Sequence, residues 1–170
     1  VSEIICPDSV KYDLSFIHGK PVSKCRLFTD EKYGFVKTAK LPAAGRTVSE
    51  LLNFFENAGS GESFRRMCVF DALILNIDRH FGNFGMIMNN ENMKILKAAP
   101  VFDNNRSLCF DLDDDQLKNT DWCIRKCHPA FGSDFISTAR GLLTDDIRND
   151  LINMQGFRFS QHSKIKTEQT

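Results

Sequence analysis

The sequence contains no hydrophobic run long enough to cross a membrane. Its longest apolar stretch, from Met67 to Ile77, is interrupted by Asp71 and Asn76, and it falls short of the roughly 20 residues that a spanning helix needs. Neither sign of charge is in excess, because 22 basic residues balance 22 acidic ones. These absences argue against a membrane protein and against a general nucleic-acid or anionic-lipid surface. Partners are therefore expected to bind at a defined site.

The six cysteines also lack the spacing of a disulfide framework. Scattered thiols are typical of proteins in a reducing compartment, and the first residues show no signal-peptide pattern, so we expect a cytoplasmic location. Cys123, Cys127 and His128 form a short Cys-x3-Cys-His group. Because no second pair stands at ligand spacing, ordinary thiols are expected there instead of a zinc site.

The first forty residues show strand patterns. Alternating apolar residues at 9–18 and 22–28 flank Gly19-Lys20-Pro21, and this combination predicts an antiparallel hairpin. Residues 29–34 are predicted to form a loop. Residues 40–45, which include proline and glycine, are predicted to be a connector.

Helical patterns begin at Thr47. The sequence Thr47-Val48-Ser49-Glu50 is a capping box and predicts a helix over 47–57. A second helix is predicted to start near Glu62. Its apolar residues at 67–75 point in all directions around the helix axis, which predicts a helix buried on every side. Asp71 lies within it, and its carboxylate is expected to be satisfied by nearby backbone or by a basic side chain.

The remaining elements are short. Residues 84–88 and 93–96 are predicted strands on either side of an asparagine-rich turn. Two helices are predicted over 134–143 and 144–154, the second one capped by a threonine and acidic in its first turn. The polar tail over 161–170 is predicted to be frayed.

One stretch carries three polar residues at a spacing suited to phosphoryl transfer. Asn83 follows Asp78 by five positions, and Asp103 follows Asn83 by twenty, beyond the predicted short strands. Phosphoryl transfer needs alignment and charge neutralisation above all, and Mg²⁺ prefers oxygen ligands. We therefore predict that Asp103 and Asn83 bind Mg²⁺. Asp78 is predicted to face the acceptor hydroxyl and to orient or take its proton.

Three neighbouring side chains are predicted to support this loop. Arg79 could neutralise a phosphate or pair with an acidic neighbour, and both alternatives stay open because a guanidinium suits either anion. His80 is expected to form structural hydrogen bonds, since Asp78 already occupies the position of the base. Asn76 is expected to brace the loop through its side-chain amide.

Two segments carry a resemblance to a known family. The string NIDRHFGNFG at 76–85 resembles the catalytic loop of the HipA-like serine/threonine kinases, and APVFDN at 99–104 resembles their metal-binding segment. The resemblance implies an α+β fold with a mostly helical kinase-like C-lobe over 46–170. Residues 1–45 would then hold the end of an N-lobe, as a β-hairpin, and the hinge. It also implies ATP and Mg²⁺ as cofactors, with Asp78 as the catalytic base.

The same resemblance implies a protein Ser or Thr as the phosphoryl acceptor. A Gly-rich phosphate loop and a strand lysine in the expected setting are missing, so the complete enzyme is expected to take N-lobe residues from a longer chain or a partner. An antitoxin-like partner is a further expectation. Two alternatives stay open: a non-catalytic kinase-fold remnant that binds a partner, and a lipid or small-molecule kinase, because the Asp-Arg-His-x-x-Asn string is also similar to phosphoinositide kinases.

Overall fold

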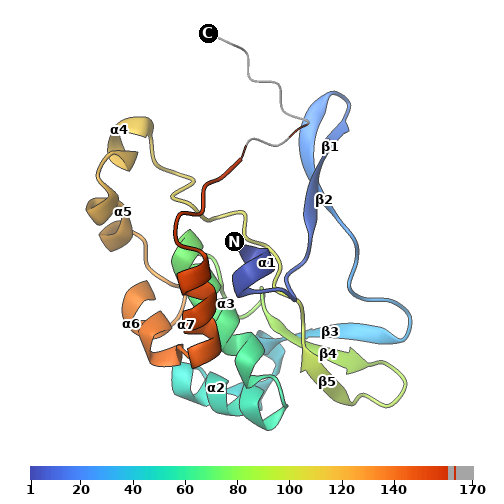
Figure 1. The fold of residues 1–170 in the computed structure, drawn as a ribbon. Helices are drawn as coiled ribbons and strands as arrows, with labels where there is room; N and C mark the ends of the chain where they lie inside the picture. The colour runs from blue at the N-terminus through green and yellow to red at the C-terminus, as the bar shows by residue number, and fades with distance from the viewer. Residues whose placement is uncertain (161–162, 164–170) are drawn as a thin grey trace.

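The computed structural model describes residues 1–160 and 163 of the chain. These residues form a mixed α+β fold (Figure 1), as predicted. The strands are β1 (Tyr12–Ile17), β2 (Lys20–Cys25), β3 (Tyr33–Lys37), β4 (Gly85–Asn89) and β5 (Ile95–Ala98). The α-helices are α1 (Ser2–Ile5), α2 (Val48–Asn57), α3 (Gly61–Ile74), α4 (Asp114–Leu117), α5 (Thr120–Lys126), α6 (Phe135–Leu142) and α7 (Asp145–Asn153); η1 (Thr38–Lys40) and η2 (Pro42–Ala44) are short 3-10 helices.

The predicted hairpin is present as the pair β1–β2, which projects away from the rest of the chain (Figure 1). Its register pairs Ile17 with Lys20, so the turn consists of His18 and Gly19. Both turn residues have positive φ, 51° and 76°, as a two-residue turn with the twist of the strands requires. The predicted turn position was wrong, because Lys20 and Pro21 belong to β2.

The second sheet has the strand order β3-β4-β5 and is antiparallel throughout. Its first strand begins within the predicted loop at 29–34, where the prediction was wrong for Tyr33 and Gly34. A glycine in a short segment hides a strand pattern, and this glycine lets the end of the Asn90 side chain lie close to the strand. A Cβ on Gly34 would clash with the Asn90 side chain. The division of the chain into 1–45 and 46–170 stays a prediction.

The capping box predicted for α2 is confirmed. The hydroxyl of Thr47 accepts a hydrogen bond from the backbone N–H of Glu50, and Glu50 Oε2 accepts from the backbone N–H groups of Thr47, at 2.9 Å, and Arg46, at 3.0 Å. These backbone hydrogen bonds, first that of Arg46, lower the pKa of Glu50 from 4.5 to about 2. These hydrogen bonds therefore favour the ionised form of Glu50 at the start of α2.

Replacing Glu50 with glutamine is expected to destabilise the protein in a pH-dependent way. A carboxylate with a depressed folded-state pKa contributes stability above its unfolded pKa of about 4.5, and this contribution disappears as the pH falls toward about 2. Urea unfolding of the wild type and of Glu50→Gln should be measured from neutral pH down to about pH 2. The wild type should be more stable at neutral pH, and this difference in the free energy of unfolding should shrink in acid. The matched control is Glu91→Gln, an exposed carboxylate. A loss of unfolding free energy in Glu50→Gln that is the same at all pH values would contradict the prediction.

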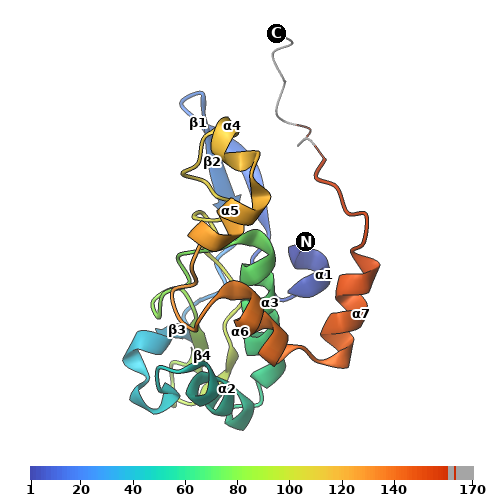
Figure 2. The same cartoon turned by 90° about the vertical axis from the view of Figure 1, so that its left-hand side faces the viewer.

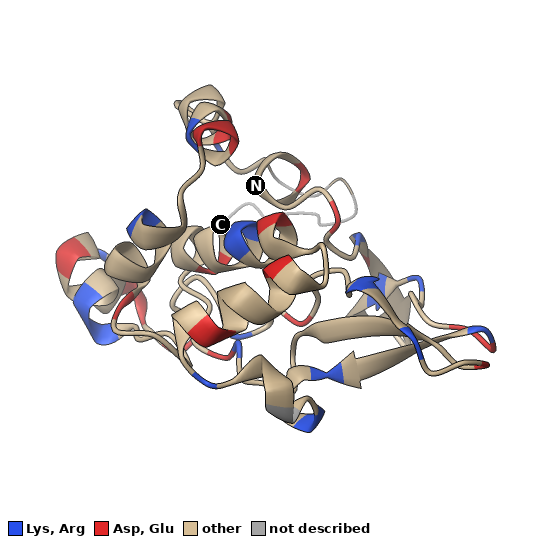
Figure 3. Ribbon diagram, turned by 90° about the horizontal axis from the view of Figure 1, so that it is seen from below, with Lys and Arg blue, Asp and Glu red and all other residues tan. Residues whose placement is uncertain are grey.

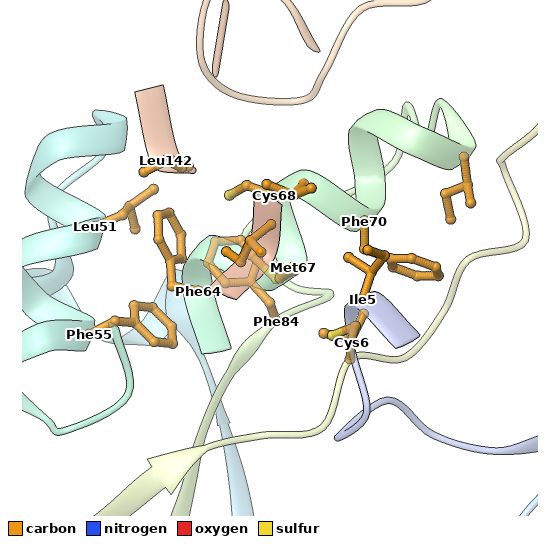
Figure 4. Close-up of a cluster of buried hydrophobic side chains, with 14 of the residues drawn as sticks. Ile5, Cys6, Leu51, Phe55, Phe64, Met67, Cys68, Phe70, Phe84 and Leu142 are labelled. Carbon is orange, nitrogen blue, oxygen red and sulfur yellow. The ribbon is translucent and has the colours of Figure 1, made fainter. Parts of the chain in front are cut away.

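Helix α3 is central to the hydrophobic core. Figure 4 shows Leu51 and Phe55 of α2 at one end of the core cluster and Ile5 near Phe70 of α3 at the other. Helix α1 also lies beside α3 and α7 (Figure 2). Burial on every side was predicted for α3, but Leu73 is 43% exposed. The apolar residues of a helix do not by themselves show which of its faces stays exposed to solvent in the folded chain.

Helices α4 and α5 were not predicted; both are short and lie in sequence between Asp103 and α6. Each is capped by a polar side chain, and three thiols close to them form a small second core with Phe135: Cys109, Cys123 and Cys127. In the described part of the chain, no three His, Cys, Asp or Glu side chains are grouped as in a metal site. The helices predicted over 134–143 and 144–154 are present as α6 and α7.

Charged residues of both signs are interspersed along the helices (Figure 3). Across the residues that the structure describes, no helix is long and apolar enough to cross a membrane. The frayed tail predicted for 161–170 lies outside the described residues, apart from Ser163.

Candidate active site

The predicted catalytic loop connects α3 to β4 and is held at both ends. At its start, Leu75 has a left-handed conformation and its N–H bonds to the Asp71 carbonyl, which also accepts from the N–H of Asn76 at 2.9 Å. At its end, Phe84 follows Asn83 and is buried. Its ring packs in an aromatic cluster with neighbouring centroids about 5.1–6.3 Å apart, formed by Phe55, Phe64, Phe81, Phe84 and Phe131. The position of the loop is therefore fixed by the core.

Arg79 links this loop to the segment that contains Asp103. The side chain is 2% exposed, and Nε and Nη2 each donate to one carboxylate oxygen of Asp71 at 2.9 Å. Nη1 donates to the carbonyls of Asn83 and Phe102, and Nη2 also donates to the side-chain oxygen of Asn104. A guanidinium has five N–H donors, and these contacts use all of them.

This geometry favours one of the two alternatives left open for Arg79. Because its N–H donors are all directed to protein acceptors, none is left for a phosphate. Arg79 instead holds together two chain segments that are separated in sequence by a hairpin. Phe102 and Asn104, which flank Asp103, are both bound by the same guanidinium that binds the Asn83 carbonyl. The loop and the Asp103 segment are therefore adjacent.

Asp71 is neutralised by the basic side chain of Arg79, as expected, and also accepts a hydrogen bond from Asn76. The Asn76 amide donates to Asp71 Oδ1 at 2.9 Å, and its own oxygen accepts from the backbone N–H of Asp78 at 3.1 Å. Burial raises the pKa of the Asp71 carboxyl, although the adjacent guanidinium and amide act in the opposite direction. Asn76 thus contacts both the buried ion pair and the backbone of the loop at Asp78, which is the bracing geometry expected for it.

Asp78 and Asn83 are held by backbone contacts that leave their side-chain oxygens available. Asn83 Nδ2 donates to the Asp78 carbonyl at 3.0 Å, while its Oδ1 receives no hydrogen bond from the residues that the structure describes. The Asp78 side chain is 29% exposed, and its Oδ1 lies 3.8 Å from Nη1 of Arg106. His80 is exposed, and its Nδ1 accepts from the N–H of Gly82 at 3.0 Å, a structural hydrogen bond.

Asp103 lines a cavity of about 430 Å³ together with Tyr12, Ser23, Asn104 and Asn105. Its backbone has φ 55°, and its N–H donates to the Tyr12 hydroxyl at 3.0 Å. The carboxylate forms no ion pair with the residues that the structure describes. Sequence reasoning missed Tyr12, because a tyrosine in a predicted hairpin strand carries no local signal of a contact with Asp103.

The side chains present suit a hard divalent cation. Mg²⁺ is bound by one or two carboxylates together with other oxygen ligands, and Asp103 and Asn83 offer a carboxylate and an amide oxygen that protein donors leave available. The Arg79–Asp71 ion pair is buried, whereas the side chain of Asp78 is partly exposed. Mg²⁺ therefore fits the chemistry of these donors, while the individual roles of the side chains stay predictions.

The arrangement of helices and strands is similar to that of a known kinase. The structure superposes on the crystal structure of a Helicobacter pylori proinflammatory kinase, CtkA, with a TM-score of 0.60 and 16% sequence identity over 91% of this chain and 77% of that chain. The fold is kinase-like. No family model and no curated protein matches the sequence. The kinase-like fold is therefore confirmed, whereas membership of the HipA-like family stays a prediction.

Proposed function

We propose that this chain holds the catalytic residues of an ATP- and Mg²⁺-dependent kinase of HipA-like type that phosphorylates Ser or Thr of a protein. The observation that carries the proposal is the Arg79 network. It joins the loop that contains Asp78 and Asn83 to the two residues that flank Asp103. A kinase-like fold supports the same conclusion, because the predicted acid and amide positions lie in the loop after α3 and in the segment after β5.

Each residue has a distinct role in the proposed reaction. Asp78 would accept a hydrogen bond from the acceptor hydroxyl and take its proton as the oxygen attacks the γ-phosphorus of ATP. The bond between the γ-phosphorus and the β,γ-bridging oxygen would break, and ADP would leave. Asn83 and Asp103 would hold Mg²⁺ through their side-chain oxygens. ATP would supply the phosphoryl group, and Mg²⁺ would neutralise part of its negative charge. Arg79 would maintain the spacing between the two segments without touching substrate.

In this proposal the residues that bind the ATP phosphates are supplied by an N-lobe. We propose that an N-lobe, from a longer chain or from a partner, packs against the hairpin β1–β2. An antitoxin-like protein is proposed as an alternative partner. In the described sheets these two strands pair with each other alone, and a two-stranded hairpin has little stability by itself. Co-purification followed by mass measurement of the complex would test for such a partner.

Replacing Asp103 with asparagine is expected to raise the Mg²⁺ concentration needed for half-maximal phosphoryl transfer by more than about tenfold, since even changes beside a metal ligand cost 10–100-fold. Transfer of labelled phosphate from ATP should be measured across a Mg²⁺ series. Asp111→Asn is the matched control, because Asp111 is an exposed carboxylate farther along the same segment.

The acceptor is tested in the same assay. Protein acceptors and phosphoinositide vesicles should be offered in parallel, with label expected on Ser or Thr. If only the lipid is labelled, the chain is a lipid kinase and the proposal of a protein acceptor is wrong. If the wild-type chain, alone and with its N-lobe partner, transfers no phosphate at any Mg²⁺ concentration, the catalytic proposal fails and a non-catalytic remnant is the better account.

A further inference from the structure

Tyr12 makes a contact with the metal-binding segment that the proposed reaction does not use. Its hydroxyl accepts a hydrogen bond from the backbone N–H of Asp103 at 3.0 Å, although the two residues are 91 positions apart. Tyr12 opens strand β1, whereas Asp103 follows the three-stranded sheet. Both residues line the cavity of about 430 Å³ described above.

The backbone of Asp103 is in a conformation that needs support. Its φ of 55° lies in the left-handed region, which is disfavoured for residues with a Cβ and persists where the surroundings hold it. Arg79 binds the Phe102 carbonyl before Asp103 and the Asn104 side chain after it. Tyr12 binds the amide of Asp103 itself. Three consecutive residues are thus held from two sides.

Tyr12 belongs to a short series of contacts between the hairpin and this segment. The N–H of Val10 donates to the Val101 carbonyl at 2.8 Å, and two residues further along both segments Tyr12 meets Asp103. Phe28, which follows β2, packs on Phe102 with ring centroids 5.4 Å apart. The hairpin and the residues that flank it therefore contact Val101, Phe102 and Asp103 in turn.

We propose that Tyr12 is a positioning residue of the metal site. Its hydroxyl keeps the Asp103 amide in the left-handed conformation in which the carboxylate lines the cavity, so Tyr12 acts on metal binding through Asp103 and not by touching the metal. The inference rests on the metal role of Asp103 in the proposed function. It makes the hairpin a functional part of the site.

The test is Mn²⁺ binding by the Tyr12→Phe variant, followed by paramagnetic broadening of the backbone amide signals of residues 103–105. We expect the affinity for Mn²⁺ to fall about tenfold, as for other changes beside a metal ligand. Tyr12 is 44% exposed, so urea unfolding of the variant should match that of the wild type. Tyr33→Phe removes a hydroxyl from the other tyrosine and should leave the affinity unchanged.

A double variant separates positioning from a general loss of structure. In an Asp103→Asn background, Tyr12→Phe should have no further effect on Mn²⁺ affinity, because the two residues act on the same ligand. Equal Mn²⁺ affinities for wild type and Tyr12→Phe would overturn the positioning role alone. A wild-type chain that binds no Mn²⁺ would overturn the metal role of Asp103 as well, and an affinity loss that persists in the Asp103→Asn background would show that Tyr12 acts elsewhere.

Discussion

Replacing Arg79 with methionine is expected to lower the free energy of unfolding by about 3–5 kcal/mol, the typical cost of removing one partner from a buried ion pair. Methionine is apolar and replaces none of the five hydrogen bonds. The Asp71 carboxylate, which is 4% exposed, would lose its cation, and the carbonyls of Asn83 and Phe102 would lose a donor. The change should also separate the catalytic loop from the Asp103 segment.

Urea unfolding at neutral pH measures this loss directly. Arg65→Met is the matched control, because Arg65 forms a partly exposed ion pair with Glu56 and such pairs contribute roughly 0–1 kcal/mol. The double change Arg79→Met with Asp71→Leu should recover part of the stability, since a buried ion pair can be replaced by apolar side chains. A loss for Arg79→Met no larger than for Arg65→Met would contradict the central role of this network.

The loss of unfolding free energy in Arg79→Met should depend on pH. Burial raises the pKa of Asp71, and removal of Arg79 takes away the charge that opposes this rise. A carboxyl with a raised folded-state pKa favours the folded state when protonated, and this contribution is lost as the pH rises through the folded-state pKa. The difference between Arg79→Met and wild type should therefore shrink as the pH is lowered, and a difference that grows in acid would contradict this account.

Replacing Asp78 with asparagine is expected to reduce kcat by about 10²–10⁴-fold, the usual contribution of a general base. Asparagine has nearly the same shape but cannot take the proton of the acceptor hydroxyl at neutral pH. The contacts that position this residue use its backbone, because its N–H donates to Asn76 and its carbonyl accepts from Asn83. The loop should therefore keep its structure, and the affinity for ATP should change little.

Steady-state phosphoryl transfer with saturating ATP and Mg²⁺ tests this prediction. Arg106→Gln is the matched control, because it removes the cation 3.8 Å from Asp78 and leaves the carboxylate in place. A kcat for Asp78→Asn within the range of the Arg106→Gln variant would show that Asp78 is not the base. An unchanged kcat with a raised KM for the acceptor would assign Asp78 to acceptor binding instead.

Several local elements could be predicted because their energetic causes are close together in sequence. The capping box of α2 needs Thr47 and Glu50 alone, and the β1–β2 hairpin needs alternating side chains around a glycine turn. The spacing of Asp78, Asn83 and Asp103 led to a predicted phosphoryl-transfer site, and the roles of these residues stay predictions. Strand β3 escaped prediction because Gly34 interrupts the pattern of a short strand.

The arrangement of the site depended on contacts between distant residues. Whether Arg79 bound a phosphate or a carboxylate was open until the folded chain placed Asp71, two carbonyls and Asn104 around one guanidinium. The Tyr12 contact with Asp103 had no local signal at all. Residue types and their spacing specify local hydrogen bonds and candidate ligands, whereas the partners of a buried guanidinium or a tyrosine hydroxyl follow from how the hairpin, α3 and the sheet pack together.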